Sequence, residues 1–216
     1  PSSVAAYLVM QAKRTKTMSN TTASAVSHYL DIYLLPDPEF ATPNLMNALY
    51  AKLHRALHDR IQAQKDSIGI SFPDQRNTTA PLGTTLRLHS SEAALTALMS
   101  STWLTGMRDH TRCTPIQAIP SGIQTHRSVR RIDVQSNPEK LRRRWLKRHP
   151  AQPEAAARAA YPDTAAQRSR HAFIQLSSRS NGHQYKLFIE QTPANAHAGN
   201  FSSFGLSTNN STIPWF

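Results

Sequence analysis

Apolar and polar residues alternate along residues 28–35, which read HYLDIYLL. This two-residue period, rich in aromatic and branched side chains, predicts a strand that ends at Pro36 and Pro38. From residue 42 the period changes, and apolar residues recur every three or four positions in TPNLMNALYAKLHRALHDRIQ. Thr42 is placed to cap a helix and Pro43 suits its first turn, so we expect a long amphipathic helix.

Two further strands and a second helix are predicted in the first half of the chain. SIGISF and TTLRLHS have the composition of strands, SSEAALTALMS has a helical pattern, and a last strand is expected near RCTPIQAIP. The order strand–helix–strand–strand–helix–strand predicts a ferredoxin-like βαββαβ unit over about residues 28–120.

The second half predicts a different arrangement. HRSVRRIDVQ has strand propensity, a basic helix follows it, and HAFIQLSS and HQYKLFIE flank the turn RSNG as in a β-hairpin. We therefore expect an α+β protein in three parts. These are an N-terminal extension (residues 1–27), a ferredoxin-like domain (28–120), and a C-terminal α/β domain (121–216) that carries the basic helix over residues 137–149.

Charge changes this picture because it is concentrated in one block. The chain has 216 residues, a net charge of +12 and a pI near 10.4. Within residues 127–148, only Asp133 and Glu139 oppose nine basic side chains. The nine are Arg127, Arg130, Arg131, Lys140, Arg142, Arg143, Arg144, Lys147 and Arg148. Such a block implies a polyanionic partner, either nucleic acid or a membrane surface.

Cysteine content and hydropathy exclude other classes. A single cysteine, Cys113, excludes an intramolecular disulfide framework and a cysteine-based zinc site. No apolar run approaches the length of a membrane span, and AAYLVM near the start is too short for the core of a signal peptide. We expect a protein of the reducing cytoplasm.

The basic stretch SNPEKLRRRWLKRHP predicts a helix with its charges on one side. Ser136 with Glu139 forms a capping-box pattern, and Pro138 suits the first turn. At 100° per residue, five basic side chains fall in one arc of roughly 140°. They are Lys140, Arg143, Arg144, Lys147 and Arg148, named here the basic stripe. Leu141 and Trp145 share a neighbouring face that is suited to packing on the domain.

A solvated basic face is the alternative interpretation of this helix. Three observations favour nucleic acid instead. Arginine outnumbers lysine, as phosphate and guanine recognition favour; acidic residues at i±4 are almost absent; and the preceding strand extends the charge. A membrane surface is disfavoured because the helix has few apolar anchors.

The chain resembles the CRISPR-associated repeat-processing endoribonucleases of type I-F systems. Blocks of the family occur in family order from residue 28 to the end: HYLDIYLLPDPEF, LMNALYAKLHRAL, IGISFPD, LGTTLRLHSSEAALTAL, WLTGMRDH, SNPEKLRRRWLKRH, AFIQLSSRSNGHQYKLFI, FSSFGLS and PWF. The resemblance implies an enzyme that binds a repeat stem-loop and cuts precursor CRISPR RNA at the 3′ base of the stem. It also implies metal-independent chemistry without a cofactor, a 2′,3′-cyclic phosphate product, and retention of the guide RNA within a surveillance complex.

The resemblance also implies roles for individual residues in the reaction. His54 matches the catalytic histidine, and an imidazole suits transfer of the ribose proton. Without the resemblance, His54 would be an ordinary histidine on an amphipathic helix. Ser178 and Ser180 match serines that hold the ribose at the cleavage site, although serines beside Asn-Gly are also common in turns.

Other residues match positions that hold the RNA. Tyr185 takes the place of an aromatic residue that stacks on the last base pair of the stem, although it would also suit a strand. Arg131, next to Arg130, matches an arginine that reads a guanine. The helix that enters the major groove is matched by Arg143, Arg144, Lys147, Arg148 and His149. Lys140, which shares the basic stripe, is expected to bind RNA with them.

Three departures from the family pattern affect these expectations. Phe204 replaces an active-site tyrosine, so a hydroxyl is missing there. Asp133 replaces a glutamine that reads adenine, and an acidic side chain cannot make that contact, so either the base has changed or Gln135 reads it. Lys147 replaces an arginine and keeps the charge without the planar fork. The alternatives are a hairpin-binding capping subunit with weak or no cleavage and, from charge alone, a structural RNA binder of ribosomal type.

Overall fold

The structure, a computed structural model, describes residues 26–63, 67–134, 138–165, 169–178 and 182–216. Nearly all of the expected N-terminal extension, Gln135, the predicted cap Ser136 and Ser180 lie outside these ranges. The described chain is a mixture of helices and antiparallel strands, so the expected α+β class is confirmed.

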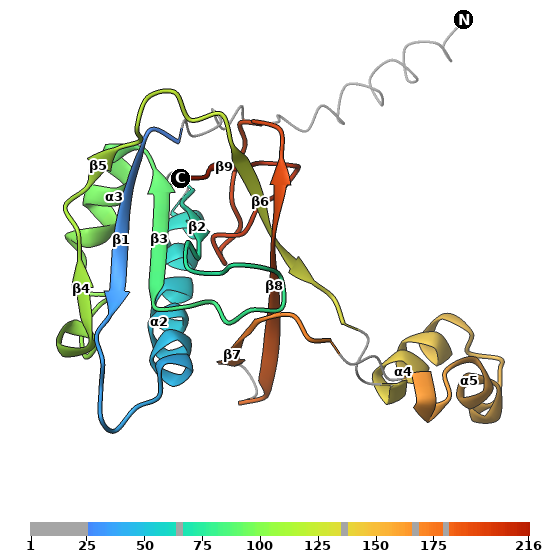
Figure 1. Cartoon of the computed structure of the whole chain (residues 1–216). Coiled ribbons are helices and arrows are strands. Elements are labelled where there is room, and N and C mark those ends of the chain that lie inside the picture. The colour runs from blue at the N-terminus through green and yellow to red at the C-terminus, as the bar shows by residue number, and fades with distance from the viewer. Residues whose placement is uncertain (1–25, 64–66, 135–137, 166–168, 179–181) are drawn as a thin grey trace, which may run out of the picture.

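The first sheet has the strand order β2-β3-β1-β4 and is antiparallel throughout. Its elements are β1 (His28–Leu34), β2 (Gly69–Ser71), β3 (Thr85–Ser90), β4 (Thr111–Cys113) and β5 (Gln117–Ala118), which also pairs with β1. Helices α2 (Thr42–Gln62) and α3 (Glu92–Met99) lie behind this sheet in Figure 1, and the 3₁₀ turn η1 (Arg108–His110) precedes β4. This order and direction match the predicted ferredoxin-like unit.

The second sheet has the order β7-β8-β6-β9 and is also antiparallel. It contains β6 (His126–Ile132), β7 (Phe173–Ser177), β8 (Gln184–Ala194) and β9 (Ile213–Pro214). The predicted hairpin of β7 and β8 is confirmed. Helix α2 packs beside β7, where the Gln175 backbone N–H donates to Asn47 Oδ1 at 2.9 Å. One hydrophobic cluster contains residues of both sheets.

Helix α2 forms because its apolar residues share one face. Leu45, Leu49, Leu53 and Leu57, spaced by four, are all buried. The predicted cap is wrong: Ala41 is the N-cap residue and makes no side-chain cap bond, while Thr42 is already helical. Pro43 in the first turn, which needs no backbone donor, starts the helix without a capping side chain.

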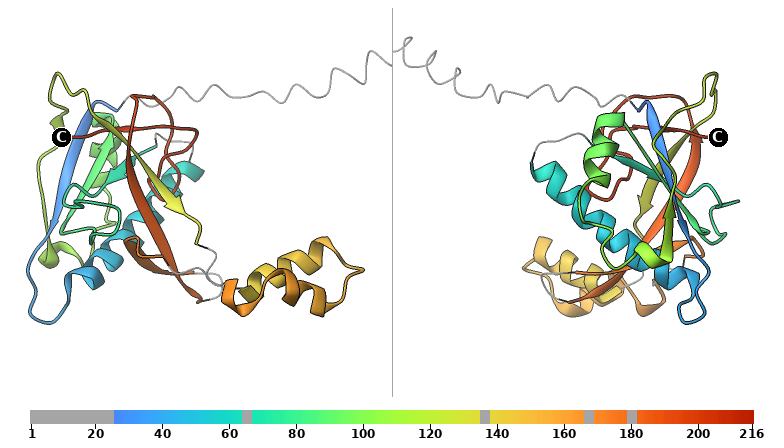
Figure 2. Two further views of the ribbon diagram at one scale, coloured as in Figure 1. Left: turned by 45° about the vertical axis from the view of Figure 1, so that its right-hand side comes forward. Right: turned by 90° about the vertical axis from the view of Figure 1, so that its left-hand side faces the viewer.

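Helices α4 (Pro138–Arg148) and α5 (Glu154–Ala160), with the 3₁₀ turn η2 (Asp163–Ala165), form an arm that projects from the sheets (Figures 1 and 2). The main contacts of α4 are with α5 and η2. Leu141 and Trp145, the face predicted to pack on the domain, are half-buried and are not part of the hydrophobic core. Within the arm, Ala157 of α5 is fully buried.

Candidate active site and RNA interface

His54 lies midway along α2 with its imidazole half-buried. Its Nδ1 lies 2.8 Å from the backbone carbonyl oxygen of Ser203. A carbonyl oxygen can only accept a hydrogen bond, so Nδ1 carries the proton and donates it. The neutral ring therefore keeps a lone pair on Nε2, the atom that can act as a base.

The surroundings of His54 favour this neutral form. Burial lowers the pKa of His54 below its ordinary value, and the charges of His58 and Arg55 act in the same direction. The hydrogen bond to the Ser203 carbonyl partly opposes the shift in pKa. His54 is therefore mostly unprotonated at neutral pH, as a general base requires.

A loop of residues 201–207 positions the histidine. The Phe204 ring stacks on His54, with ring centroids 3.9 Å apart and an interplanar angle of 10°. The Tyr50 hydroxyl donates to the Phe204 carbonyl at 2.7 Å, and the Ile70 N–H donates to the Gly205 carbonyl at 3.0 Å. Gly205 has φ +70°, and a Cβ there would lie 2.5 Å from the Ile70 side chain, so only glycine fits.

Two groups at this site were absent from the sequence prediction. Tyr50 lies four residues before His54 on the same helix, and this spacing could have identified it. The other is the Ser203 carbonyl, a backbone group that no side-chain pattern reveals.

Two residues predicted to contact the RNA, Ser178 and Tyr185, lie at the β7–β8 hairpin. The Ser178 backbone closes the turn, because its N–H donates to the His183 carbonyl and its carbonyl accepts from the Gly182 N–H, each at 2.8 Å. Tyr185 pairs with Leu176 across the hairpin and is half-buried. Burial raises the pKa of Tyr185, and the nearby charge of Arg131 opposes the shift. Tyr185 lies on β8, which pairs with β6, the strand that carries Arg131. On α2, burial raises the pKa of Tyr50 well above its ordinary value, and Tyr185 adds a smaller contribution in the same direction.

Arg130 and Arg131 lie near the end of β6, and both are exposed. Arg131 Nη2 lies 2.9 Å from Asp133 Oδ1, in a pair whose side chains are 49% and 83% exposed. Such a pair contributes about 0–1 kcal/mol, so it does not prevent Arg131 from contacting a ligand. Arg130 donates to Ser128 Oγ and Asn210 Oδ1, each at 2.7 Å.

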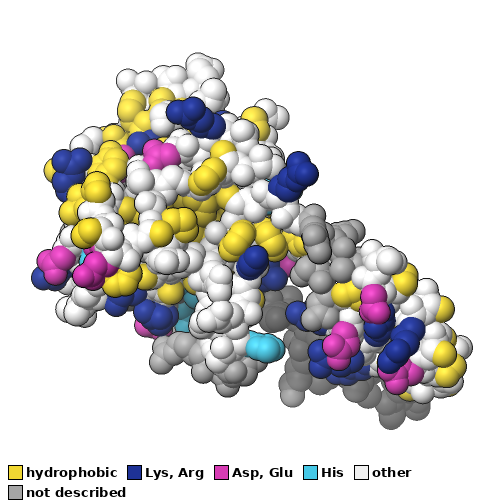
Figure 3. All heavy atoms as spheres, turned by 60° about the horizontal axis from the view of Figure 1, so that its bottom comes forward, with side chains coloured by type: hydrophobic (Ala, Val, Ile, Leu, Met, Phe, Trp, Pro, Cys, Tyr) yellow, Lys and Arg dark blue, Asp and Glu magenta, His cyan; other side chains and the backbone are white. Residues whose placement is uncertain are grey.

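The arm separates two kinds of basic residue. All five residues of the basic stripe are exposed, as periodicity predicted, and so is His149, which lies within 3.0 Å of the Trp145 carbonyl. Arg142, which falls outside the stripe, is half-buried and donates to the Tyr161 carbonyl at 2.7 Å and to Asp163 Oδ1 at 2.6 Å. In the face shown in Figure 3, Lys and Arg side chains lie on both the body and the arm, with Asp and Glu side chains among them on the arm.

Two searches bear on other chemistries. Among the described residues, no three or more His, Cys, Asp or Glu side chains cluster closely enough to hold a metal ion. In the same part of the chain, no helix combines the length and the apolar character that crossing a bilayer requires.

Comparison with known proteins confirms the resemblance. The family described as CRISPR-associated protein (Cas_Csy4) matches residues 29–216. A protein of Pseudomonas aeruginosa (strain UCBPP-PA14) named CRISPR-associated endonuclease Cas6/Csy4 is 42% identical over 193 residues, which cover 88% of this chain and 100% of the relative. A protein of the same name from Escherichia coli (strain UTI89 / UPEC) has the same identity and coverage. The chain belongs to the Cas6/Csy4 family of CRISPR-associated endonucleases.

Proposed function

We propose that this protein is an endoribonuclease that binds a CRISPR repeat stem-loop and cuts the precursor RNA at the 3′ base of the stem. The single observation that carries the proposal is the imidazole of His54, whose Nδ1 is held by a carbonyl while Nε2 keeps its lone pair. Family membership supplies the substrate class.

The reaction is a transesterification within the RNA. His54 Nε2 removes the proton of a ribose 2′-hydroxyl, and the 2′-oxygen forms a bond to the adjacent phosphorus. The bond from phosphorus to the 5′-oxygen of the next nucleotide breaks, and that oxygen takes up a proton. The products are a 2′,3′-cyclic phosphate and a 5′-hydroxyl. Ser178 and Ser180 restrain the ribose so that its 2′-oxygen is in line with the phosphorus.

The remaining residues hold the stem. The basic stripe and His149 contact the stem in its groove, Arg131 reads a guanine, and Tyr185 stacks on the last base pair. In this division of labour, residues 28–120 supply the general base and residues 121–216 supply most of the RNA contacts. The cut hairpin stays bound to the protein, which joins the other subunits of a surveillance complex.

The test is cleavage of the repeat RNA in EDTA by the wild type and by two variants of α2. We expect His54→Ala to lose at least a hundredfold in rate, the usual lower range for general-base catalysis. Asp59→Ala is the matched control, because Asp59 is an exposed residue of the same helix and is not among the groups that shift the pKa of His54. Loss of cutting in EDTA, or equal rates for His54→Ala and the wild type, would contradict the mechanism.

Phe204 favours a second candidate function, a hairpin-binding capping subunit that cleaves weakly or not at all. Its ring covers one face of His54 but supplies no hydroxyl. A single-turnover assay separates the two functions, since a capping subunit binds the hairpin tightly without forming product. Phe204→Tyr adds a hydroxyl beside His54, and a rise in the single-turnover rate would show that the missing hydroxyl limits the reaction.

A further inference from the structure

The β7–β8 hairpin has an outer face that the proposed hairpin contacts leave unused. Alternation along the two strands turns Ile174, Leu176, Leu187 and Ile189 into the core and leaves the intervening residues on the opposite side. These residues form three cross-strand pairs, Phe173 with Phe188, Gln175 with Lys186, and Ser177 with Gln184. We name these six residues the outer hairpin face.

An aromatic group on this face is open to solvent. Phe173 is 39% exposed, one of three large hydrophobic residues with such exposure in the described chain. Its ring lies edge-on to Phe188 with centroids 5.6 Å apart, and the Lys186 ammonium lies 4.3 Å above it. A contact between an exposed cation and an aromatic ring is weaker than base stacking, so a nucleobase can displace the flexible lysine.

The polar groups around Phe173 suit RNA. None of the six residues is acidic, and Glu190, the next outward-facing residue of β8, lies 3.6 Å from His171 Nε2. Gln175 Nε2 donates to Gln184 Oε1 at 2.7 Å, which places two amides beside the aromatic pair. Lys186 is the charged residue among the six, so the face carries a positive charge that attracts a polyanion.

The position of the face connects it to the cleavage site. β7 is the edge strand of its sheet, and Ser178 directly follows its last residue. Ser177, Gln175 and Phe173 succeed one another at intervals of about 7 Å along the strand. They form a path that begins beside Ser178 and ends at the exposed ring.

We propose that the outer hairpin face binds the single-stranded RNA immediately upstream of the stem-loop. The proposal rests on the proposed function, because cleavage at the 3′ base leaves the upstream strand as the one still attached. A base stacks on Phe173, Lys186 swings from the ring to a phosphate, and the two glutamines contact neighbouring bases or sugars.

The experiment compares the binding of three RNAs to the full chain. They are a product hairpin that ends at the 3′ base of the stem, the same hairpin with ten upstream unpaired nucleotides, and an unstructured RNA alone. We expect the upstream strand to tighten binding about tenfold in the wild type and Phe173→Ala to remove that gain without changing binding of the bare hairpin. The gain in affinity from the upstream strand should also depend on salt. Lys186→Met should lower the slope of log gain against log salt by about 0.7, because it removes one phosphate contact.

Two further variants make the test specific. Phe40→Ala is the matched control, since Phe40 is 48% exposed but lies in the loop before α2, where its ring is edge-on to His110. It should keep the full gain. Phe173→Leu keeps the apolar packing without the ring, so stacking predicts that it also loses the gain.

Several outcomes would overturn the proposal. If the upstream strand fails to tighten binding to the wild type, or if Phe173→Ala keeps the tighter binding, the outer hairpin face does not bind this RNA. A protein would then be the partner to test. A gain lost with Ala but kept with Leu would assign Phe173 to packing. Failure of the bare hairpin to bind refutes the proposed function instead. If the bare hairpin does not bind, the outer hairpin face is tested with the unstructured RNA instead. It is an RNA site only if Phe173→Ala weakens binding of that RNA.

Discussion

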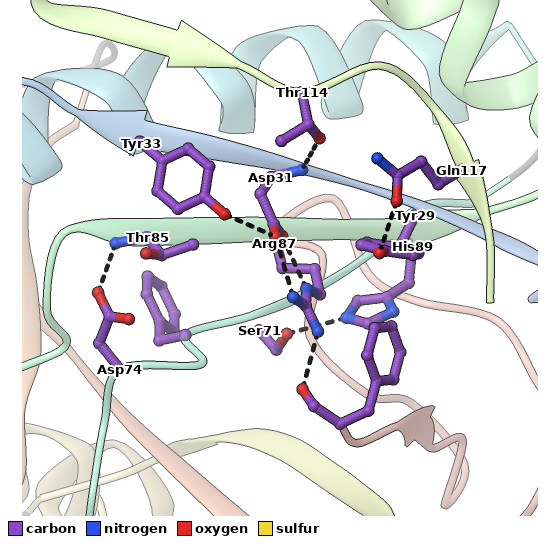
Figure 4. A network of polar contacts seen from close by, with 12 residues as sticks. Tyr29, Asp31, Tyr33, Ser71, Asp74, Thr85, Arg87, His89, Thr114 and Gln117 are labelled. Carbon is purple, nitrogen blue, oxygen red and sulfur yellow. Dashed lines mark hydrogen bonds and ion pairs between the residues drawn. The ribbon is translucent and has the colours of Figure 1, made fainter. Parts of the chain in front are cut away.

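Arginines of the body and of the arm are placed in opposite ways. In the body, the Arg87 side chain is 12% exposed and donates to Asp31 through Nε at 2.7 Å and Nη2 at 2.9 Å (Figure 4). Its Nη1 donates to the Phe216 carbonyl at 2.9 Å, and its guanidinium lies within 5 Å of the Tyr29 and Phe216 ring centroids. In the arm, the arginines of the basic stripe are exposed.

The difference shows why a count of charges overstates an RNA surface. Arg127 counted toward the basic block, yet its guanidinium lies 3.8 Å from the Trp215 ring centroid, and burial lowers its pKa. Arg142 lies within the basic helix and serves to join α4 to the end of α5. A buried or half-buried arginine with aromatic, carbonyl or carboxylate partners stabilises the fold, whereas exposed arginines on one helix face suit a polyanion.

Removing the body's buried pair should have the largest effect. Arg87→Ala leaves the Asp31 carboxylate, 6% exposed, without its guanidinium, and the free energy of unfolding should fall by about 3–5 kcal/mol. Urea unfolding followed by circular dichroism measures this loss. Arg112→Ala is the control on the same sheet, because Arg112 is exposed and lies over Tyr33 at 5.3 Å; it should change stability by less than about 0.5 kcal/mol. If both variants lost the same free energy of unfolding, the contrast between buried and exposed arginines would be contradicted.

A buried histidine beside Arg87, His89, should have a smaller effect on stability, and this effect should depend on pH. His89 is fully buried, its Nε2 lies 2.8 Å from Ser71 Oγ, and burial together with the charge of Arg87 lowers its pKa to about 3. In the unfolded chain this histidine binds a proton near pH 6.5, whereas in the folded chain it stays neutral until about pH 3. The free energy of unfolding is therefore at its full value above pH 6.5 and decreases as the pH falls toward 3.

The expected loss from His89 between pH 7 and pH 5 is about 2 kcal/mol. His89→Gln keeps a polar group near Ser71 but does not titrate, so its urea midpoint should depend less on pH. His58→Gln is the control for the substitution itself, because it alters an exposed histidine of α2 and leaves the buried His89 in place. If His89→Gln and the wild type lose stability in parallel, His89 does not remain neutral in the fold.

Local periods were readable from the sequence, and long-range contacts were not. The four-residue spacing from Leu45 to Leu57 and the one-sided stripe of α4 follow from helix geometry, and both are confirmed. The hydrogen bond from Tyr50 to the Phe204 carbonyl joins residues 154 positions apart, so no window of sequence contains it. The helix that α4 contacts within its domain, α5, was likewise not predicted, because amphipathicity specifies a face but not its partner.

The smallest predicted effects concern single residues of the arm. Arg144→Ala and Arg148→Ala remove exposed charges outside the core, so the free energy of unfolding should change by less than about 0.5 kcal/mol. If each side chain contacts a phosphate, each variant should lower the slope of log affinity against log salt by about 1. Titrations of the repeat hairpin between 50 and 200 mM salt measure this slope.

Arg158→Ala decides whether position or charge alone matters in the arm. Arg158 is an exposed arginine of α5 that lies 3.4 Å from Glu154, outside the basic stripe. A binding site formed by the stripe predicts that this variant leaves the salt slope unchanged, although it removes the same charge from the same arm. Equal slope changes for Arg144→Ala, Arg148→Ala and Arg158→Ala would mean that the arm attracts RNA by net charge. A lower slope for Arg144→Ala and Arg148→Ala with an unchanged slope for Arg158→Ala would place the stem against the basic stripe of α4. The buried arginines of the body could not provide such a binding face.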